Sequence, residues 1–550
     1  MTSPVRGPVE PGGSAESAQP GAAPVRGGTA WRALMAAVSG VLLALAFPPV
    51  GASLLAPIAV ALFVLATYRT TAWHGAWLGA LQGALSFGIL LRWLSLVGGD
   101  AWILLVSLCA FWIALLGAAQ ALATRLRWWP LWVACLWVLQ EALRDRIPLG
   151  GFPWGRLAFA QTATTLTPWA AVGGAPLVTF ATALAGALLA FVALVLLRRR
   201  ASPTGSASPG RRAAWRQWTA AGVGGLLALA LAGLLVPRPV TGQEDAGPAT
   251  TVAAVIQGGV PSTGVSVNDE RREVLDRHIA QTLRLAEDVA AGEAPQPDVV
   301  IWPENAVDID PYRNADVADA LESAARAVGA PIVVGAIIDA PGDPDMIANV
   351  GIVWDPLTGP GDAYLKRHPV PFGEFIPFRD LIAPLVGRLD RIPRDMMPGG
   401  SPGVLRAGDV VLGDVICFEV AYDDIVREAI TAGGRVLVVQ TNNATFAGLG
   451  QPEQQVAMSR LRAVEHGRTV LVAATSGISA VIGPDGSVIA EIGEAETGYL
   501  VREIALRDSL TIADRLGTWP EWLLAAAGLI AAAWAGLRHR VRRRAREPAA

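Results

Sequence analysis

Eight apolar runs constrain this chain of 550 residues more than any other feature of its sequence. A helix that spans a membrane needs about 20 mainly apolar residues, and 52% of the chain is hydrophobic. The pattern predicts an integral membrane bundle of about eight helices, with seven spans within residues 31–237, an eighth at 519–537, and a large polar domain between them. The apolar runs lie at about 33–47, 51–67, 73–97, 102–124, 130–143, 168–197, 219–236 and 520–537.

The arginines predict how these helices are oriented. The connection 198–216 contains six arginines and no acidic residue, and the tail 538–550 contains six more. Two connections expected on the opposite side, 47–53 and 98–102, contain no basic residue, although 144–166 contains three. Because basic loops stay in the cytoplasm, we expect a multi-pass protein of the plasma or inner membrane with cytoplasmic N- and C-termini. The polar domain is then extracytoplasmic.

Composition also limits the partners and cofactors that can be expected. Residues 1–30 are rich in Pro, Gly, Ala and Ser, a composition that predicts disorder. The sequence does not predict a polybasic face of the kind that binds nucleic acid, so nucleic acid is not expected as a partner. The five histidines show no spacing typical of metal ligands, so neither a metal nor another cofactor is predicted.

The polar block at 250–505 alternates strand-like and helix-like segments. Continuous Val and Ile runs are typical of strands that are buried on both faces, and alternation with helices favours a layered α/β domain. The strand candidates are 251–257, 298–304, 331–338, 349–355, 410–418, 435–442, 469–475 and 478–483, and the helix candidates are 269–291, 315–328, 422–432 and 453–467.

Two residue counts draw attention to single positions in this block. Cys109 and Cys135 lie within apolar runs, so Cys417 is the only cysteine of the polar block and has no disulfide partner there. Of 44 basic residues, Lys366 is the only lysine. Arginine cannot replace lysine where a compact, deprotonatable charge is needed, although one lysine can also survive by chance.

Three polar groups stand at or near the ends of predicted segments. Glu304 ends "VVIWPE", Lys366 lies in "YLKRHPVPFGEF", and Cys417 ends "LGDVIC". Each also has an ordinary structural explanation. Glu304 could be the solvated end of a strand, Lys366 a surface charge, and Cys417 a small buried hydrophobic residue. Together they are the parts of an activated nucleophile, because the carboxylate can accept the thiol proton. The ammonium can lower the thiol pKa and stabilise an oxyanion.

Several motifs place the chain near known families. The block 250–505 resembles the nitrilase, or carbon–nitrogen hydrolase, superfamily, whose domain is an αββα sandwich with a Glu-Lys-Cys triad. With its apolar runs, the chain from about 31 to 540 resembles the apolipoprotein N-acyltransferase family. The matching motifs are "GFPW" at 151–154, "WPE" at 302–304, "KRHPVPFGEFIP" at 366–377, "CFE" at 417–419, "TNNATF" at 441–446 and "SRLRAVEHGR" at 459–468.

The resemblance implies a role for each site residue. Glu304 is the general base, Lys366 the cation beside the oxyanion, and Cys417 the nucleophile. The chain departs from the family pattern at Phe418, where tyrosine is common, and within 262–270, where the family's tryptophan has no counterpart. The supporting residues implied are Glu374 as a second carboxylate, the Phe418 amide as an oxyanion donor, Glu419 beside the nucleophile, and Asn349 in the site lining.

The implied reaction is an acyl transfer in two steps. A membrane phospholipid donates an acyl chain to the cysteine, and the thioester then acylates the α-amino group of a diacylglyceryl-modified cysteine at the N-terminus of an apolipoprotein. Three alternatives remain open at this point: a membrane-anchored amidase that acts on a small soluble substrate, a transporter with an outer receptor domain, and an inactive scaffold that binds lipoproteins.

Overall fold

The computed structural model describes residues 28–200, 209–237, 249–261 and 267–544. Four predictions therefore fall wholly or partly outside the described residues. They are the disordered segment at 1–30, the middle of the basic connection at 201–208, the end of the basic tail at 545–550, and part of the segment without the family's tryptophan, at 262–266.

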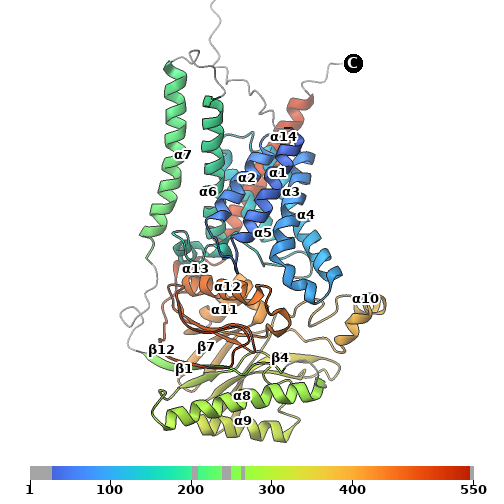
Figure 1. Cartoon of the computed structure of the whole chain (residues 1–550), viewed down its shortest axis with the longest axis vertical. Coiled ribbons are helices and arrows are strands. Elements are labelled where there is room, and N and C mark those ends of the chain that lie inside the picture. The colour runs from blue at the N-terminus through green and yellow to red at the C-terminus, as the bar shows by residue number, and fades with distance from the viewer. Residues whose placement is uncertain (1–27, 201–208, 238–248, 262–266, 545–550) are drawn as a thin grey trace, which may run out of the picture.

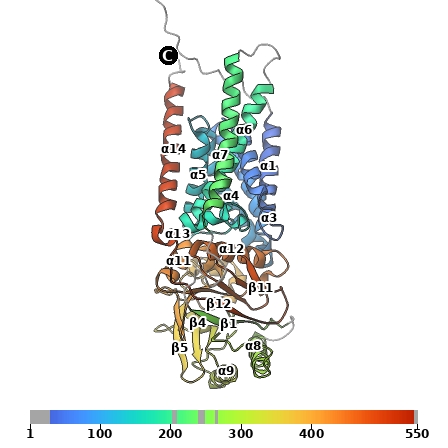
Figure 2. The ribbon, with the colours of Figure 1, turned by 90° about the vertical axis from the view of Figure 1, so that its left-hand side faces the viewer.

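Each of the eight apolar runs coincides with a helix, and these helices form a bundle along the long axis of the molecule (Figure 1, Figure 2). Within the described residues, four helices are long and apolar enough to cross a membrane. They correspond to α4, α6, α7 and α14. The helices are α1 (Thr29–Leu45), α2 (Leu55–Thr67), α3 (Ala72–Leu90), α4 (Gly99–Ala123), α5 (Trp129–Arg144), α6 (Ala170–Arg200), α7 (Pro209–Leu235) and α14 (Trp519–Arg544).

Small residues allow two of these helices to pack closely. A Cβ atom added at Gly75 in α3 would clash with the backbone oxygen of Gly117 in α4, and one added at Gly117 would clash with that of Gly75. Because lipid and side chains are equally apolar, helices in a membrane gain from such close backbone approach. The α3–α4 pair therefore depends on glycine at both positions.

The polar block folds into two six-stranded sheets that lie face to face. In one sheet the order is β12-β1-β2-β3-β4-β5, and in the other it is β11-β10-β9-β8-β7-β6. Strands β1, β2 and β3 are parallel, as are β7, β8 and β9, and the other neighbours are antiparallel. The strands are β1 (Thr250–Gln257), β2 (Val299–Ile301), β3 (Ile332–Asp339), β4 (Ile347–Asp355), β5 (Gly359–Leu365), β6 (Val404–Ala407), β7 (Val410–Ile416), β8 (Val436–Thr441), β9 (Val470–Ala474), β10 (Ser479–Ile482), β11 (Val488–Ile492) and β12 (Gly498–Ala505).

Helices cover both outer faces of the paired sheets, so the predicted αββα sandwich is confirmed. Helices α8 (Val267–Ala290) and α9 (Ala315–Val328) lie on the face away from the bundle (Figure 1). Helices α11 (Asp423–Thr431) and α12 (Gln451–His466) lie between the second sheet and the bundle (Figure 1). The continuous layer of side chains between the sheets is the buried core of the domain.

The eight predicted strands and four predicted helices of this domain are all present. The four strands that were not predicted, β5, β6, β11 and β12, are the four edge strands of the two sheets. Residues 360–363 of β5, for example, are all exposed. An edge strand exposes part of its surface to water and carries Gly, Pro or charged residues, so it lacks the continuous apolar run that marks a central strand.

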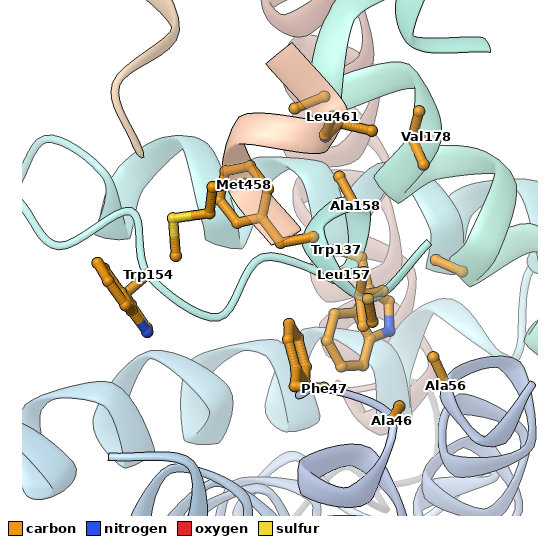
Figure 3. Packing of buried hydrophobic residues seen from close by; sticks show 14 of the residues in the cluster. Ala46, Phe47, Ala56, Trp137, Trp154, Leu157, Ala158, Val178, Met458 and Leu461 are labelled. Carbon is orange, nitrogen blue, oxygen red and sulfur yellow. The ribbon is translucent and has the colours of Figure 1, made fainter. Parts of the chain in front are cut away.

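The sandwich and the bundle share one hydrophobic core. Met458 and Leu461 of α12 belong to the same buried cluster as Trp154, Leu157 and Val178 of the bundle and its loops (Figure 3). Apolar side chains removed from water in this way contribute about 25 cal/mol per Å². The two parts are therefore held together by packing rather than by a flexible tether.

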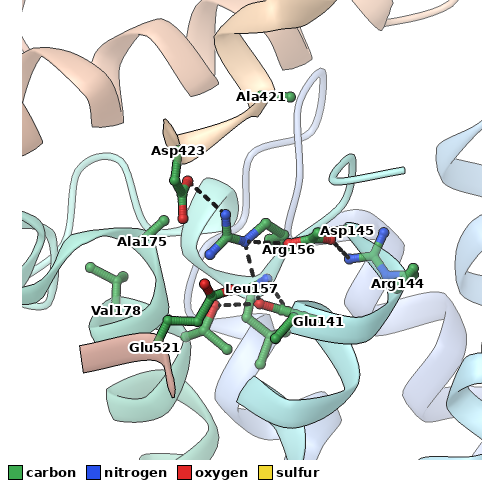
Figure 4. Close-up of polar contacts among 12 residues, drawn as sticks. Glu141, Arg144, Asp145, Arg156, Leu157, Ala175, Val178, Ala421, Asp423 and Glu521 are labelled. Carbon is green, nitrogen blue, oxygen red and sulfur yellow. Dashed lines mark hydrogen bonds and ion pairs between the residues drawn. The ribbon is translucent and has the colours of Figure 1, made fainter. Parts of the chain in front are cut away.

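Buried ion pairs reinforce the same junction (Figure 4). The Arg156 guanidinium, from the loop between α5 and α6, lies 2.7 Å from Asp423 Oδ1 and 3.3 Å from Asp145 Oδ2. Arg462 of α12 also lies 2.7 Å from Asp423 Oδ1. Burial would raise the pKa of Asp423, but these two arginines outweigh it and hold the pKa below its usual value. Removing one partner of a buried pair typically costs about 3–5 kcal/mol.

A carboxyl group without hydrogen-bond partners lies between the two sheets. Asp414 of β7 is fully buried, and neither of its side-chain oxygens has a partner among the described residues. A Cβ atom at Gly351 would clash with Asp414 Oδ2, so glycine is required opposite this acid. Burial, followed by the nearby Glu419, raises the pKa of Asp414 well above its ordinary value of 3.8.

Asp414→Asn is expected to stabilise the protein increasingly as pH rises. Below the unfolded pKa near 3.8, Asp414 is protonated in both the folded and the unfolded protein and does not reduce the free energy of unfolding. Above that pH the unfolded chain loses the proton while the folded chain, whose pKa is raised, keeps it. The free energy of unfolding therefore falls by about 1.4 kcal/mol per pH unit until the folded-state pKa is reached. Asparagine is neutral throughout. The unfolding temperature of the purified protein, compared at pH 5 and pH 8, tests this expectation, and an equal difference at both values would contradict it.

Candidate active site

The three principal residues predicted from the sequence follow strand ends. Glu304 lies three residues after β2, and Lys366 and Cys417 directly follow β5 and β7. The carboxyl ends of strands are where open α/β sheets place their sites. The structure brings Glu304 and Lys366 into direct contact, with the Lys366 Nζ atom 3.0 Å from Glu304 Oε1.

Lys366 lies between two carboxylates. Its side chain is 1% exposed, and its Nζ atom is 2.7 Å from Glu374 Oε1. Asn349 Nδ2 donates to the same oxygens, at 2.8 Å to Glu304 and 3.2 Å to Glu374. Burial would lower the pKa of Lys366, but Glu304 and Glu374 outweigh it and raise the pKa well above its usual value. The ammonium therefore stays charged.

Backbone amides fix the remaining oxygens of both carboxylates. Glu304 Oε2 accepts a hydrogen bond of 2.9 Å from the Asn442 amide, which directly follows β8. Glu374 Oε2 accepts one of 2.7 Å from the Val370 amide. Such charge-assisted bonds are stronger than bonds between neutral groups. Both carboxylates are therefore held in defined orientations around the lysine.

Cys417 directly follows β7 and is the first residue of the short helix η7 (Cys417–Ala421). Its φ is +56°, in the left-handed region that non-glycine residues seldom adopt. Such a conformation costs of order 1–3 kcal/mol and persists where the surroundings impose it, often at active sites. The thiol is free, and its Sγ atom lies 3.3 Å from Thr441 Oγ1.

The surroundings keep this thiol protonated at rest. Burial is the main cause that raises the pKa of Cys417 to about 12, and the negative charge of Glu304 is the second cause. Lys366 and the Thr441 hydroxyl act in the opposite direction but are outweighed. Lys366 thus lowers the thiol pKa, as its charge was expected to do, but burial of the sulfur has the larger effect. A neutral thiol requires a base when it reacts.

Glu419 connects the lysine loop to the cysteine turn. Its Oε1 atom accepts hydrogen bonds from the amides of Arg367, at 2.7 Å, and His368, at 3.0 Å, and its Oε2 atom accepts one of 2.8 Å from the Ile416 amide. The Tyr364 hydroxyl donates to the same carboxylate. The Glu419 carboxylate thus accepts hydrogen bonds from the segment after Lys366 and from the residue before Cys417. These bonds position Lys366 and Cys417 relative to each other.

Phe418, the residue after Cys417, contacts the loop between α5 and α6. Its ring stacks on Trp154, with centroids 5.6 Å apart and an interplanar angle of 5°, and on Phe152, at 5.7 Å and 22°. Trp154 Nε1 in turn donates to Gln454 Oε1 of α12 at 2.6 Å. The predicted role of the Phe418 amide stays a prediction, but the loop at 151–154 clearly reaches the residue after the cysteine.

Three further residues contact the site and were not predicted. Thr441 is the last residue of β8, the parallel neighbour of β7, and Asn442 follows it. Both belong to the "TNNATF" motif at 441–446, so the motif and the strand order were signals that could have identified them. Gln455 Nε2 donates to the Cys417 carbonyl at 3.0 Å from α12, and no local pattern indicates this contact. Among the described residues, no group of three or more His, Cys, Asp or Glu side chains is placed to hold a metal ion. The prediction that no metal or other cofactor is needed stays a prediction.

Two family models match the two parts of this architecture. Residues 39–188 match the family model described as apolipoprotein N-acyltransferase N-terminal domain, and residues 253–512 match the one described as carbon-nitrogen hydrolase. Among solved structures, an amidase from Nesterenkonia sp. aligns with a TM-score of 0.34 at 19% identity, over 49% of this chain and 94% of the amidase.

Two curated relatives cover most of the chain. The apolipoprotein N-acyltransferase of Mycolicibacterium smegmatis is 40% identical over 505 residues, which are 90% of this chain and 84% of the relative. The apolipoprotein N-acyltransferase of Pseudomonas syringae is 30% identical over 411 residues, 74% of each chain. The chain therefore belongs to the apolipoprotein N-acyltransferase family and carries a carbon–nitrogen hydrolase domain in its C-terminal half.

Proposed function

We propose that this protein transfers a fatty acyl chain from a membrane phospholipid to the N-terminal diacylglyceryl-cysteine of apolipoproteins, as the last step of lipoprotein maturation. The observation that carries the proposal is the cluster of Glu304, Lys366 and Cys417, which follow the carboxyl ends of β2, β5 and β7. The ring of Phe418, next to Cys417, contacts Trp154 in the loop between α5 and α6. Family membership supplies the substrate class.

The first half-reaction forms an acyl-enzyme. Glu304 accepts the proton of the Cys417 thiol as the sulfur attacks an ester carbonyl of the phospholipid. Lys366 and the Phe418 amide stabilise the negative oxygen of the tetrahedral intermediate. The ester C–O bond then breaks, and the leaving lysophospholipid oxygen takes the proton from Glu304. A thioester remains on Cys417.

The second half-reaction uses the same groups. The α-amino group of the lipid-modified cysteine attacks the thioester carbonyl, and Glu304 accepts a proton from the nitrogen. The C–S bond breaks, an amide is formed, and the sulfur is protonated again. A thioester suits this relay because it converts one difficult transfer into two easier steps. Glu374 and Asn349 keep Lys366 and Glu304 aligned in both halves.

For the membrane topology, we propose eight spans within residues 31–237 and 519–537, with both termini in the cytoplasm. Residues 250–505 form the extracytoplasmic catalytic domain, and 538–550 form a basic cytoplasmic tail. The arginine-rich C-terminal ends of α6 and α14 lie at the end of the bundle opposite the sandwich (Figure 1), in agreement with this orientation.

The bundle also favours lipid substrates over a small soluble amide. Withdrawing an acyl chain from the bilayer costs about 0.8 kcal/mol per CH₂ group, and a site anchored next to the membrane avoids most of that cost. The triad alone would serve an amidase equally well. The match of residues 39–188 to the N-terminal domain of the acyltransferase family favours the transferase.

The acceptor can be tested with the purified full-length chain in mixed micelles. A phospholipid of defined acyl composition and a synthetic peptide with an N-terminal diacylglyceryl-cysteine are the substrates, and peptide mass is the measurement. We expect the peptide to gain one acyl group at its α-amino group. The same peptide with an acetylated amine is the matched control and should gain none. Hydrolysis of a small amide without peptide acylation would instead favour the amidase.

A further inference from the structure

The hydroxyl of Thr441 has more acceptors than it can serve. Thr441 ends β8 and is 1% exposed. Its Oγ1 atom lies 3.3 Å from Cys417 Sγ and 3.0 Å from Gln455 Oε1. A hydroxyl carries one proton, so it can donate to only one of these two atoms at a time.

The amide of Gln455 is held in place on both sides. Its Nε2 atom donates to the Cys417 carbonyl at 3.0 Å, which turns Oε1 toward Thr441. That Oε1 atom also accepts a hydrogen bond of 2.6 Å from Asn443 Nδ2. Gln455 Oε1 therefore keeps a donor whether or not Thr441 donates to it, and no buried polar atom is left unpaired when the hydroxyl turns away.

The charge on sulfur decides which acceptor the hydroxyl serves. A neutral thiol sulfur is a weak acceptor, so at rest the Thr441 proton is directed to Gln455 Oε1. A thiolate is a charged acceptor, and hydrogen bonds to charged groups are stronger. Rotation about one side-chain bond then redirects the proton toward sulfur without displacing any heavier atom.

We propose that Thr441 is a catalytic residue that donates a hydrogen bond to the Cys417 thiolate as it forms and releases it when the sulfur is neutral. The proposal rests on the proposed role of Cys417 as nucleophile. The thiol proton passes to Glu304, whereas the Thr441 proton remains covalently bound to Oγ1 throughout. The hydroxyl therefore stabilises the charged state more than the resting state, which is the condition for a catalytic effect.

The test compares Thr441→Val, which keeps the shape but loses the hydroxyl, with Thr441→Ser, which keeps the hydroxyl. The measurement is the rate at which iodoacetamide alkylates Cys417 in the full-length protein between pH 7 and 9, resolved from Cys109 and Cys135 by peptide mass spectrometry. We expect Thr441→Val to slow alkylation about tenfold at each pH, the size of effect of one hydrogen bond to a charged group. Thr441→Ser should stay within about twofold of the wild type, because it keeps that bond.

Thr251→Val is a matched control. Thr251 is also a buried threonine in a strand, but it lies near the start of β1, and its hydroxyl donates to Asp298 Oδ2 at 3.0 Å. This variant should not change alkylation of Cys417. If Thr441→Val does not fold, as judged by its unfolding temperature, Thr441→Ala replaces it with the same expected result. Equal slowing by the valine and serine variants, or no slowing by valine, would overturn the proposal.

The outcome is independent of the proposed lipid reaction. Iodoacetamide requires neither phospholipid nor acceptor, so a failure of the wild-type protein to form a thioester would count against the function but not against Thr441. Conversely, unchanged alkylation in Thr441→Val, with normal lipid chemistry in the wild type, would overturn only the role of the hydroxyl.

Discussion

Replacing Lys366 by arginine is expected to slow acyl-enzyme formation at least ~100-fold although the positive charge is kept, which is the size of effect seen when one oxyanion donor is removed. The ammonium lies 3.0 Å from Glu304 and 2.7 Å from Glu374 in a site with almost no exposure. A guanidinium is larger and planar, and its donors are fixed in a fork. It cannot contact both carboxylates and the oxyanion from the position of one nitrogen.

Arg367→Lys is the matched control for this exchange. Arg367 is the neighbouring residue, but its guanidinium is partly exposed and pairs with Glu428 at 2.6 Å. Since exposed pairs are worth about 0–1 kcal/mol, this variant should form the acyl-enzyme at nearly the wild-type rate. The time course of the mass gain gives both rates, and the unfolding temperature checks the fold. A Lys366→Arg rate within a few-fold of the wild type would refute the assigned role.

Glu304→Gln is expected to have the second large effect, a loss of about 10²–10⁴ in acylation rate, as for a general base. The thiol has its pKa raised to about 12, so very little thiolate exists at neutral pH without a base. In the variant the Glu304 charge is lost, but burial, the largest cause of the raised pKa, remains. The residual rate of the variant should therefore rise about tenfold per pH unit between pH 7 and 9, because the thiolate fraction grows in that proportion while the pKa stays above this range. The wild-type rate should rise less steeply.

The control for the loss of a carboxylate is Glu322→Gln. Glu322 lies on α9, on the face of the sandwich away from the bundle, and pairs with Arg326. We expect the acylation rate of the Glu322→Gln variant, and the pH dependence of that rate, to equal those of the wild type. A Glu304→Gln variant with the wild-type pH profile would mean that another group accepts the thiol proton.

The central strands could be predicted from the sequence, and so could the contact between Glu304 and Lys366 in the candidate site. A buried strand is an unbroken run of Val and Ile, and Glu304, Lys366 and Cys417 stand out as reactive groups near or at the ends of segments. Thr441 lies in an equivalent place, at the end of β8. It opens the "TNNATF" motif, but it was not singled out as a site residue because a threonine after an apolar run is common and carries no charge.

Other features depend on packing between segments that are distant in the chain. Gln455 reaches the Cys417 carbonyl only because α12 lies against the second sheet, and Phe418 meets Trp154 only because the sandwich rests on the bundle. The pKa of Cys417 also depends on this packing, because burial is the largest cause of its rise. Local sequence patterns contain none of this information.

The most direct test of the account is the intact mass of the purified protein after incubation with one defined phospholipid, with Cys417→Ala measured alongside. We predict that the wild type gains the mass of one acyl chain and loses it again in hydroxylamine, and that the alanine variant gains nothing. An acyl gain that persists in Cys417→Ala, or a folded wild type that gains no mass from any phospholipid supplied, would contradict the thioester mechanism.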